Sequence, residues 1–205
     1  MKGDARLRLF VGVPLAASVS GRLARWLVGG RQERPRLKWV EPHNLHLTLR
    51  FLGERPGGEL ELIRAAVERA VGGRRAFTIV VQGVGGFPSL ERARTVWAGV
   101  GDGEGELADL ARALEEALLA ALPALPPAEH PFRAHITLAR TREGYVNGER
   151  WAYLAAARDR LWGAMDVDRV ILYRSQLFPG GPVYTPLATW HLVPASGTGT
   201  PAGGR

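Results

Sequence analysis

Hydrophobic positions recur along this chain with two different periods, and each period predicts one kind of secondary structure. Short runs rich in β-branched and aromatic residues, bounded by turn residues, predict strands. We expect these strands at residues 6–13, 38–40, 45–52, 77–84, 95–100, 135–139, 167–177 and 183–193. Apolar residues spaced as on one face of a helix predict helices at residues 15–28, 59–71, 106–122 and 150–161.

Gly and Pro residues indicate where these elements end. The pair Gly29-Gly30 is expected to end the first helix. Gly53 is expected to end the strand predicted at residues 45–52. Residues 85–89 contain two Gly and a Pro, which predicts a turn there. A Pro-rich connector at residues 123–131 follows the third helix.

The fold class follows from the connections. Several of them are too short for a parallel crossover, so we predict an α+β fold with mostly antiparallel sheets. The length of 205 residues suits one large domain or two small lobes, and we expect one bilobal domain over residues 1–195. Residues 196–205 are rich in Gly, Thr, Pro and Ala, carry no apolar anchor and are expected to be disordered.

One tetrapeptide pattern, His-x-Thr-Leu, occurs twice, as His46-Leu47-Thr48-Leu49 and as His135-Ile136-Thr137-Leu138. Each copy lies on an expected strand, where residues i and i+2 point to the same face. The His and Thr of a copy therefore project together, while the intervening apolar side chains face a core. A single copy is best explained as a strand with a surface His. Two copies would arise in roughly 2% of shuffled chains, so the pair indicates a function.

Two histidines and two hydroxyls suit acid–base cleavage of a phosphate ester. The unperturbed histidine pKa of about 6.5 allows one ring to be neutral and the other protonated near neutral pH. The neutral ring would act as a base towards the attacking oxygen, and the charged ring would protonate the leaving oxygen. The Thr hydroxyls would donate hydrogen bonds to the phosphate. This chemistry requires no metal. The residues alone do not assign the acid and the base, because the two motifs are symmetrical.

Zinc is the competing chemistry, and it fits poorly. A catalytic zinc site needs three protein ligands, and neither motif has a carboxylate at helical spacing. His43 and His46 are three residues apart, which places them on opposite faces of a strand. With no Cys in the chain, disulfides and thiolate metal sites are excluded.

Composition and charge add little. The net charge is +7, carried by 25 Arg and two Lys. Arg forks match phosphate groups, which is compatible with a nucleic-acid substrate, and genomic base composition explains the Arg excess equally well. There is no apolar run long enough to span a bilayer and no signal-peptide stretch at the start, so no membrane partner and a cytoplasmic location are expected.

At these residues the chain resembles the two-histidine phosphoesterase superfamily, and within it the bacterial and archaeal RNA 2′,3′-cyclic phosphodiesterases, often named 2′–5′ RNA ligases. The likeness runs from Arg6 to about Val193. The stretches that carry it are residues 8–12, 39–40, 44–53, 86–88, 96–100, 131–140, 172–175 and 181–184. One departure is Ala134, where the family generally has Pro before the second His.

The resemblance implies a bilobal α+β fold with pseudo-twofold symmetry, in which each lobe gives one motif strand to a central cleft and the helices lie outside. It implies hydrolysis of an RNA terminal 2′,3′-cyclic phosphate to a 2′-phosphate, without metal or other cofactor. His46 would donate the proton to the departing 3′ oxygen, His135 would activate water, and Thr48 and Thr137 would hold the phosphate. The expected partners are RNA ends or short oligonucleotides, and the expected state is a monomer.

Two further residues are weaker candidates for substrate binding. By the same resemblance Arg140 contacts the phosphate, while Phe51 is placed where an aromatic ring could stack on a base. Each lies five residues after its His, so strict alternation puts both on the wrong face unless the strand ends or bulges first. For Phe51 we favour core packing over stacking.

Other candidate residues and functions stay open. We expect His130 to be solvent-exposed, His191 to lie at a surface or edge position, Arg133 to lie on a solvated face, and Ser175 to be structural. The reverse reaction, joining RNA ends through a 2′–5′ linkage, would use the same groups. A catalytically idle module that binds RNA ends is the rival from another class, although binding alone does not require two titrating rings.

Overall fold

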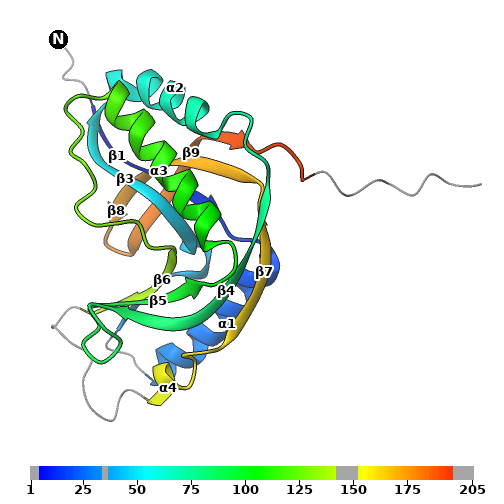
Figure 1. Cartoon of the computed structure of the whole chain (residues 1–205). Coiled ribbons are helices and arrows are strands. Elements are labelled where there is room, and N and C mark those ends of the chain that lie inside the picture. The colour runs from blue at the N-terminus through cyan, green and yellow to red at the C-terminus, as the bar shows by residue number, and fades with distance from the viewer. Residues whose placement is uncertain (1–4, 34–36, 142–151, 196–205) are drawn as a thin grey trace, which may run out of the picture.

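Nine strands form a single curled sheet in the computed structural model, which describes residues 5–33, 37–141 and 152–195 (Figure 1). The order of neighbouring strands is β7-β4-β5-β6-β3-β1-β8-β9, with β2 added to β6. All pairs between named strands are antiparallel. The strands are β1 (Arg6–Pro14), β2 (Lys38–Trp39), β3 (His46–Pro56), β4 (Phe77–Phe87), β5 (Thr95–Val100), β6 (His135–Arg140), β7 (Leu161–Val167), β8 (Arg169–Phe178) and β9 (Gly181–His191).

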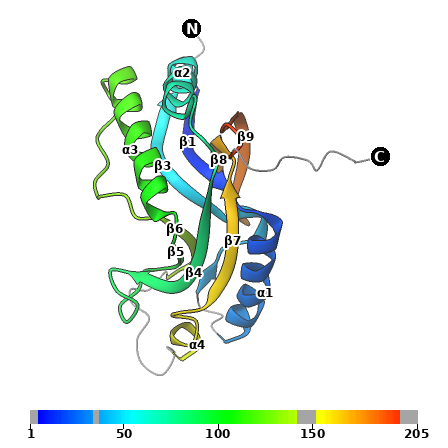
Figure 2. The same ribbon diagram turned by 45° about the vertical axis from the view of Figure 1, so that its right-hand side comes forward.

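The sheet consists of two halves of four consecutive strands, one of which also carries the short β2, and the halves meet where β3 pairs with β6 at Leu47 and Ile136. Both of these side chains are fully buried. Helices cover the halves separately (Figures 1 and 2). In one half α2 (Leu60–Val71) packs on α3 (Glu104–Ala121), which also contacts β3, and in the other half α1 (Ala17–Glu33) packs on β7. The predicted α+β class with antiparallel sheets is confirmed, and the two halves share one continuous sheet.

One hydrophobic core runs through both halves. The helices contribute side chains at the expected helical spacing, for example Leu107, Leu110, Leu114 and Leu118 of α3, which are all fully buried. The short elements are the 3₁₀ turns η1 (Pro42–Asn44) and η2 (Gly57–Glu59) and the helix α4 (Ala152–Ala155). No helix in the described ranges is long and apolar enough to cross a membrane.

The first helix does not end at Gly29-Gly30, as predicted, but continues to Glu33. These glycines serve close packing instead. A Cβ atom on Gly30 would lie 2.6 Å from the ring of Trp39, and one on Gly29 would lie 2.9 Å from the hydroxyl of Tyr153. The missing side chains therefore let two aromatic rings approach the helix.

Two strands are longer than predicted. β4 continues to Phe87, so residues 85–87 are not a turn, and Gly85 lies under the ring of Trp97, which a Cβ at this position would overlap. β3 continues past Gly53 to Pro56, because residues 54–56 go on pairing with β1. Gly53 takes a positive φ of 69° beside an irregularity in this pairing, which glycine tolerates.

The helix predicted at residues 150–161 is also largely wrong. Only Ala152–Ala155 is helical, while Leu161–Val167 forms β7, which pairs with β4. The largely alternating burial of β7 follows from that pairing. The Ala-rich segment before β7 suggested a helix from the sequence. Residues 150 and 151 and the tail at 196–205 lie outside the described residues.

Candidate active site

The two His-x-Thr motifs meet at the junction between the halves of the sheet. Their central residues, Leu47 and Ile136, are the pair that joins β3 to β6 in antiparallel register. Continued by one residue on each side, this register sets His46 across from Thr137 and Thr48 across from His135, and side chains directly opposite one another are neighbours. The four polar side chains predicted from the sequence are thus brought together on one face, with the apolar pair buried on the other.

The two histidines are held in the same way. Nδ1 of His46 donates to the carbonyl oxygen of Asn44 over 2.7 Å, and Nδ1 of His135 donates to the carbonyl oxygen of Arg133 over 2.8 Å. A carbonyl can only accept, so in each neutral ring Nδ1 carries the hydrogen and Nε2 carries the lone pair. The hydroxyl of Thr48 donates to Nε2 of His46 over 3.0 Å. Nε2 of each neutral ring is therefore the nitrogen that can accept a proton, and in His46 it accepts the hydrogen bond of Thr48.

Aromatic side chains enclose His46. The ring of Phe10 lies 4.7 Å from the imidazole between centroids, and the ring of Tyr184 meets it edge-on at 5.1 Å. Tyr173 lies farther away, at 6.3 Å. The site receives these side chains from β1, β8 and β9, so strands far apart in the sequence build one wall.

His135 has an aromatic wall of its own. Phe87 meets its imidazole edge-on at 5.1 Å, and Trp97 lies 6.5 Å away. These two side chains come from the neighbouring strands β4 and β5. The sequence offered no role for the aromatic residues of either wall, since their relation to the motifs depends on strand pairing.

Burial and nearby cations lower the pKa of both histidines. For His46 desolvation is the largest cause, the hydrogen bond to Asn44 raises the pKa in part, and repulsion from His135 and Arg140 lowers it further. For His135 desolvation again lowers the pKa most, the carbonyl of Arg133 raises it, and the charges of Arg140 and Arg133 lower it. Each ring is therefore more readily neutral than a free histidine.

A bulge follows the Thr of each motif. On β3, Thr48 pairs with Gly12 of β1 and Arg50 with Val11, which leaves Leu49 as an extra residue. On β6, Thr137 and Ala139 pair with successive residues of β5, which leaves Leu138 extra. A bulge shifts the alternation by one residue, so positions five after each His turn to the face of the site.

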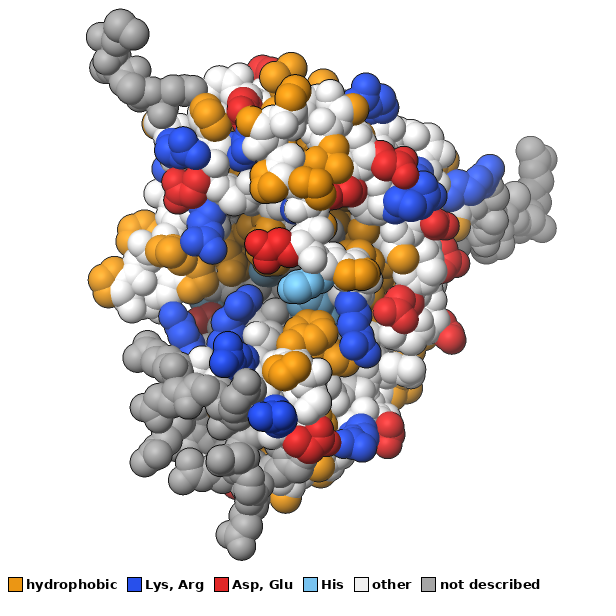
Figure 3. Space-filling model, turned by 60° about the vertical axis from the view of Figure 1, so that its left-hand side comes forward, with side chains coloured by type: hydrophobic (Ala, Val, Ile, Leu, Met, Phe, Trp, Pro, Cys, Tyr) orange, Lys and Arg blue, Asp and Glu red, His pale blue; other side chains and the backbone are white. Residues whose placement is uncertain are grey.

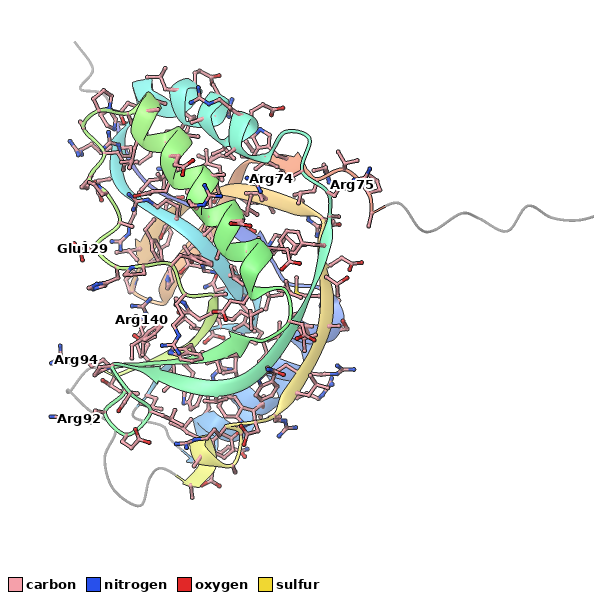
Figure 4. The ribbon with its side chains drawn as sticks, viewed as in Figure 1. Arg74, Arg75, Arg92, Arg94, Glu129 and Arg140 are labelled. Atoms are coloured by element: carbon pink, nitrogen blue, oxygen red, sulfur yellow. The ribbon has the colours of Figure 1, made fainter. Side chains whose placement is uncertain are left out.

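Phe51 and Arg140 occupy these positions. The side chain of Phe51 is 55% exposed, and its ring lies 6.0 Å from that of Phe10 between centroids. The interpretation of Phe51 as a core residue is therefore wrong. Arg140 is exposed at the end of β6, and its charge acts on both histidines and on Tyr184 (Figure 4).

A cleft of about 1500 Å³ extends from this point between β3, α3 and the connector at residues 123–131. Thr48, Phe51 and His135 all line it. Figure 3 shows the molecule from a side on which Lys and Arg side chains gather around hollows with apolar walls. The cleft is large enough for more than the reacting phosphate, since ligand pockets of roughly 300–1000 Å³ hold a drug-sized molecule.

The connector is fixed to the body by Arg50 and Glu115. Arg50 forms an ion pair with Glu115 of α3 and donates from Nη2 to the carbonyl oxygen of Pro126 over 2.6 Å. Glu115 accepts from the backbone N–H of Ala128 over 2.7 Å. The connector, which carries Glu129 (Figure 4), is thus held in place as one wall of the cleft, and the chain continues from it into β6.

The other residues considered from the sequence lie outside the two His-x-Thr motifs. His130 is exposed on the rim of the cleft and His191 is exposed on the edge strand β9, both as predicted. Arg133 is exposed, but it lies over the rings of Trp97 and Phe87, which the prediction of a solvated position missed. Ser175 sits in β8 opposite Tyr184. Within the described part of the chain, no group of three or more His, Asp or Glu side chains is placed to hold a metal ion.

Comparison with known proteins identifies the family. The family model described as the 2′-5′ RNA ligase superfamily matches residues 17–177. The chain belongs to this superfamily. A Thermus thermophilus relative named RNA 2′,3′-cyclic phosphodiesterase is 37% identical over 192 residues, which cover 91% of this chain and 90% of the relative. A relative of the same name from Methanothermobacter thermautotrophicus is 32% identical over 188 residues, covering 91% and 100% of the two chains.

Solved structures with similar sequences share the fold. The crystal structure of the Thermus thermophilus protein TT0787 gives a TM-score of 0.74 at 33% identity, covering 91% of this chain and 98% of that one. The crystal structure of Escherichia coli LigT complexed with phosphate gives a TM-score of 0.70 at 27% identity, covering 92% and 98%. The superfamily resemblance inferred from the motifs is confirmed.

Proposed function

We propose that this chain hydrolyses the terminal 2′,3′-cyclic phosphate of RNA to a 2′-phosphate, using His46 and His135 as general acid and base. The observation that carries the proposal is the identical fixing of the two rings. Each donates Nδ1–H to the carbonyl two residues before it, which leaves Nε2 of each ring as the nitrogen that can exchange a proton with the substrate. Relatives named RNA 2′,3′-cyclic phosphodiesterase, with nearly full coverage of both chains, support the substrate class.

The reaction consumes one water. Nε2 of neutral His135 takes a proton from the water as its oxygen attacks phosphorus, and the bond from phosphorus to the 3′ oxygen breaks. His46, protonated on Nε2, gives that proton to the departing 3′ oxygen. The product carries a 2′-phosphate and a free 3′-hydroxyl. Exchange of protons with solvent then returns both rings to their starting states.

The neighbouring side chains suit the charge that develops. Once His46 is protonated, the hydroxyl of Thr48 no longer donates to Nε2 and is free to donate to a non-bridging oxygen of the phosphate. Thr137 has the equivalent position in the second motif. The guanidinium of Arg140 would pair with the negatively charged phosphate. The phosphate charge would in turn offset the repulsion between Arg140 and a protonated histidine. Phe51 would support the base of the terminal nucleotide.

The assignment of the acid rests on the resemblance. In the protein without substrate the pKa of both histidines is lowered, so the direction of the shifts does not distinguish the acid from the base. A bound phosphodiester carries a negative charge, which favours the protonated form of either ring. We assign His46 as the donor and His135 as the acceptor. No step of this scheme uses a metal ion.

The test is incubation of adenosine 2′,3′-cyclic phosphate with the protein in EDTA, followed by separation of 2′-AMP from 3′-AMP. We expect 2′-AMP, and a rate reduced ~10²–10⁴-fold in His46→Gln and in His135→Gln. Binding without turnover would favour an idle RNA-end-binding module. Loss of turnover in EDTA would refute the metal-free scheme, and normal turnover of both variants would refute the roles of the histidines.

Ligation through a 2′–5′ linkage is the second candidate, and the family description favours testing it. It reverses the same steps with an RNA hydroxyl in place of water. Water at about 55 M exceeds any RNA hydroxyl in concentration, so we expect hydrolysis to dominate. An RNA with a cyclic phosphate end, mixed with one bearing a 5′-hydroxyl, would reveal joined product on a denaturing gel.

A further inference from the structure

The residue two positions before each histidine has two contacts with the site. Its carbonyl oxygen accepts from Nδ1 of the histidine, as described for Asn44 and Arg133. Its side chain reaches an element of the aromatic wall around the same histidine. The two side chains differ in chemistry, so the shared arrangement is visible only in the structure.

Asn44 ties the β8–β9 hairpin to His46. The residue is 6% exposed, and its backbone N–H donates to the carbonyl oxygen of Glu41 over 2.8 Å. Its side-chain amide donates to the carbonyl oxygen of Pro182 over 2.8 Å, across 138 positions of the chain. Pro182 lies two residues before Tyr184, whose ring meets His46 edge-on. One buried residue therefore holds both the imidazole and the strand that packs on it.

Arg133 has the corresponding role at His135. Its guanidinium lies 5.2 Å from the centroid of the Trp97 ring and 5.9 Å from that of Phe87. Both rings contact His135. A cation over an aromatic face favours one arrangement of the backbone that carries the accepting carbonyl, because the attraction is lost when the guanidinium leaves the ring.

We propose that Asn44 and Arg133 are positioning residues, whose side chains hold the backbone carbonyls that keep each imidazole in the Nδ1–H form with Nε2 directed at the substrate. The catalytic consequence rests on the proposed function, whereas the effect on the rings does not. A ring that loses its carbonyl can turn or exchange tautomers, and a misplacement of about 1 Å can cost up to about 10²-fold in rate.

The tautomer is a sharper readout than the pKa. His46 faces the charges of His135 and Arg140 and the rings of Tyr173 and Tyr184, and His135 faces Arg140 and Arg133. Loosening a wall admits water, which raises a pKa lowered by burial, while losing the carbonyl bond lowers it. These effects oppose one another in the pKa, but both disturb the Nδ1–H form.

The experiment records the ring ¹⁵N chemical shifts of the full chain by NMR at a pH where both rings are neutral. In Asn44→Ala we expect His46 to lose its pure Nδ1–H state while His135 keeps it, and in Arg133→Gln the reverse. With adenosine 2′,3′-cyclic phosphate, kcat should fall about 10-fold in each variant with KM changed less than about threefold.

Two matched controls remove similar contacts elsewhere. Arg64→Gln removes a side-chain donor to the same strand, at the carbonyl oxygen of Leu187, and Arg160→Gln removes a guanidinium 5.1 Å from the ring centroid of Trp162. Both should retain wild-type tautomers and kcat.

The proposal is overturned if both rings keep the Nδ1–H form in Asn44→Ala and Arg133→Gln, or if the controls disturb them equally. If Arg133→Gln raises KM and leaves the His135 tautomer unchanged, Arg133 contacts substrate and is not a positioning residue. Absence of turnover in the wild type would refute the proposed function and leave the NMR result to decide this inference.

Discussion

Phe51 and Arg140 are equivalent residues, because each lies five positions after the histidine of its motif and just beyond a bulge. The bulges at Leu49 and Leu138 turn both side chains to the face that carries the histidines. One half of the sheet thus presents an apolar ring to the site, and the other half presents a cation. An apolar ring can stack on the base of a nucleotide, and a cation can bind its phosphate.

Replacing Phe51 with Ala should weaken substrate binding with little effect on stability, because the ring is 55% exposed. A stacked base is worth about 1–3 kcal/mol, so KM should rise about 5- to 150-fold with kcat nearly unchanged. Steady-state kinetics on adenosine 2′,3′-cyclic phosphate measure this. Leu62→Ala is the control, since that side chain is similarly exposed on α2. An unchanged KM in Phe51→Ala would rule out stacking.

Replacing Arg140 with Gln should lower kcat/KM about 10- to 150-fold, because a hydrogen bond to a charged phosphate is worth about 1.5–3 kcal/mol. The same change removes a cation that lowers the pKa of both histidines, so both pKa values should rise. Arg6→Gln, an exposed Arg paired with Glu54, controls for net charge. If Arg140→Gln shifts neither pKa, the guanidinium does not face the rings in solution.

The pH dependence of kcat/KM should be bell-shaped with an optimum below about 6.5. The acidic limb reports the base and the basic limb reports the acid of the free enzyme. Burial lowers the pKa of both rings below the ordinary value of 6.5, so the optimum between them lies below it as well. The profile of kcat should lie at higher pH, since bound phosphate raises both pKa values. An optimum of kcat/KM above about pH 7.5 would contradict this assignment.

Glu115 and Glu116 are adjacent on α3 and should differ sharply when changed to Gln. Glu115 pairs with the largely buried Arg50 and accepts from Ala128, so Glu115→Gln should lower the free energy of unfolding by about 1–3 kcal/mol and raise KM by loosening the cleft wall. Glu116 forms an exposed pair with Arg112, so Glu116→Gln should leave the free energy of unfolding nearly unchanged. Urea unfolding and steady-state kinetics measure the free energy of unfolding and KM of the two variants. Equal changes in both variants would mean that Glu115 does not hold the connector in place.

The sequence predicted the motif faces correctly because alternation is a local property of a strand. His46 and Thr48 share a face wherever their strand pairs, and the same holds for His135 and Thr137. Most elements followed in the same way from local periodicity. The failures fell where a distant partner decides, as at Gly30, which accommodates Trp39, and at residues 161–167, which become a strand by pairing with β4.

Tertiary structure alone decided how the motifs meet. The pairing of Leu47 with Ile136, the bulges that turn Phe51 and Arg140, and the contact of Tyr184 with His46 depend on hydrogen bonds and packing between segments far apart in the chain. Strand register is set by the sum of core contacts across the whole sheet, and no local pattern encodes that sum. The sequence by itself therefore determined which side chains share a face of each strand, and the fold determined how the two faces meet.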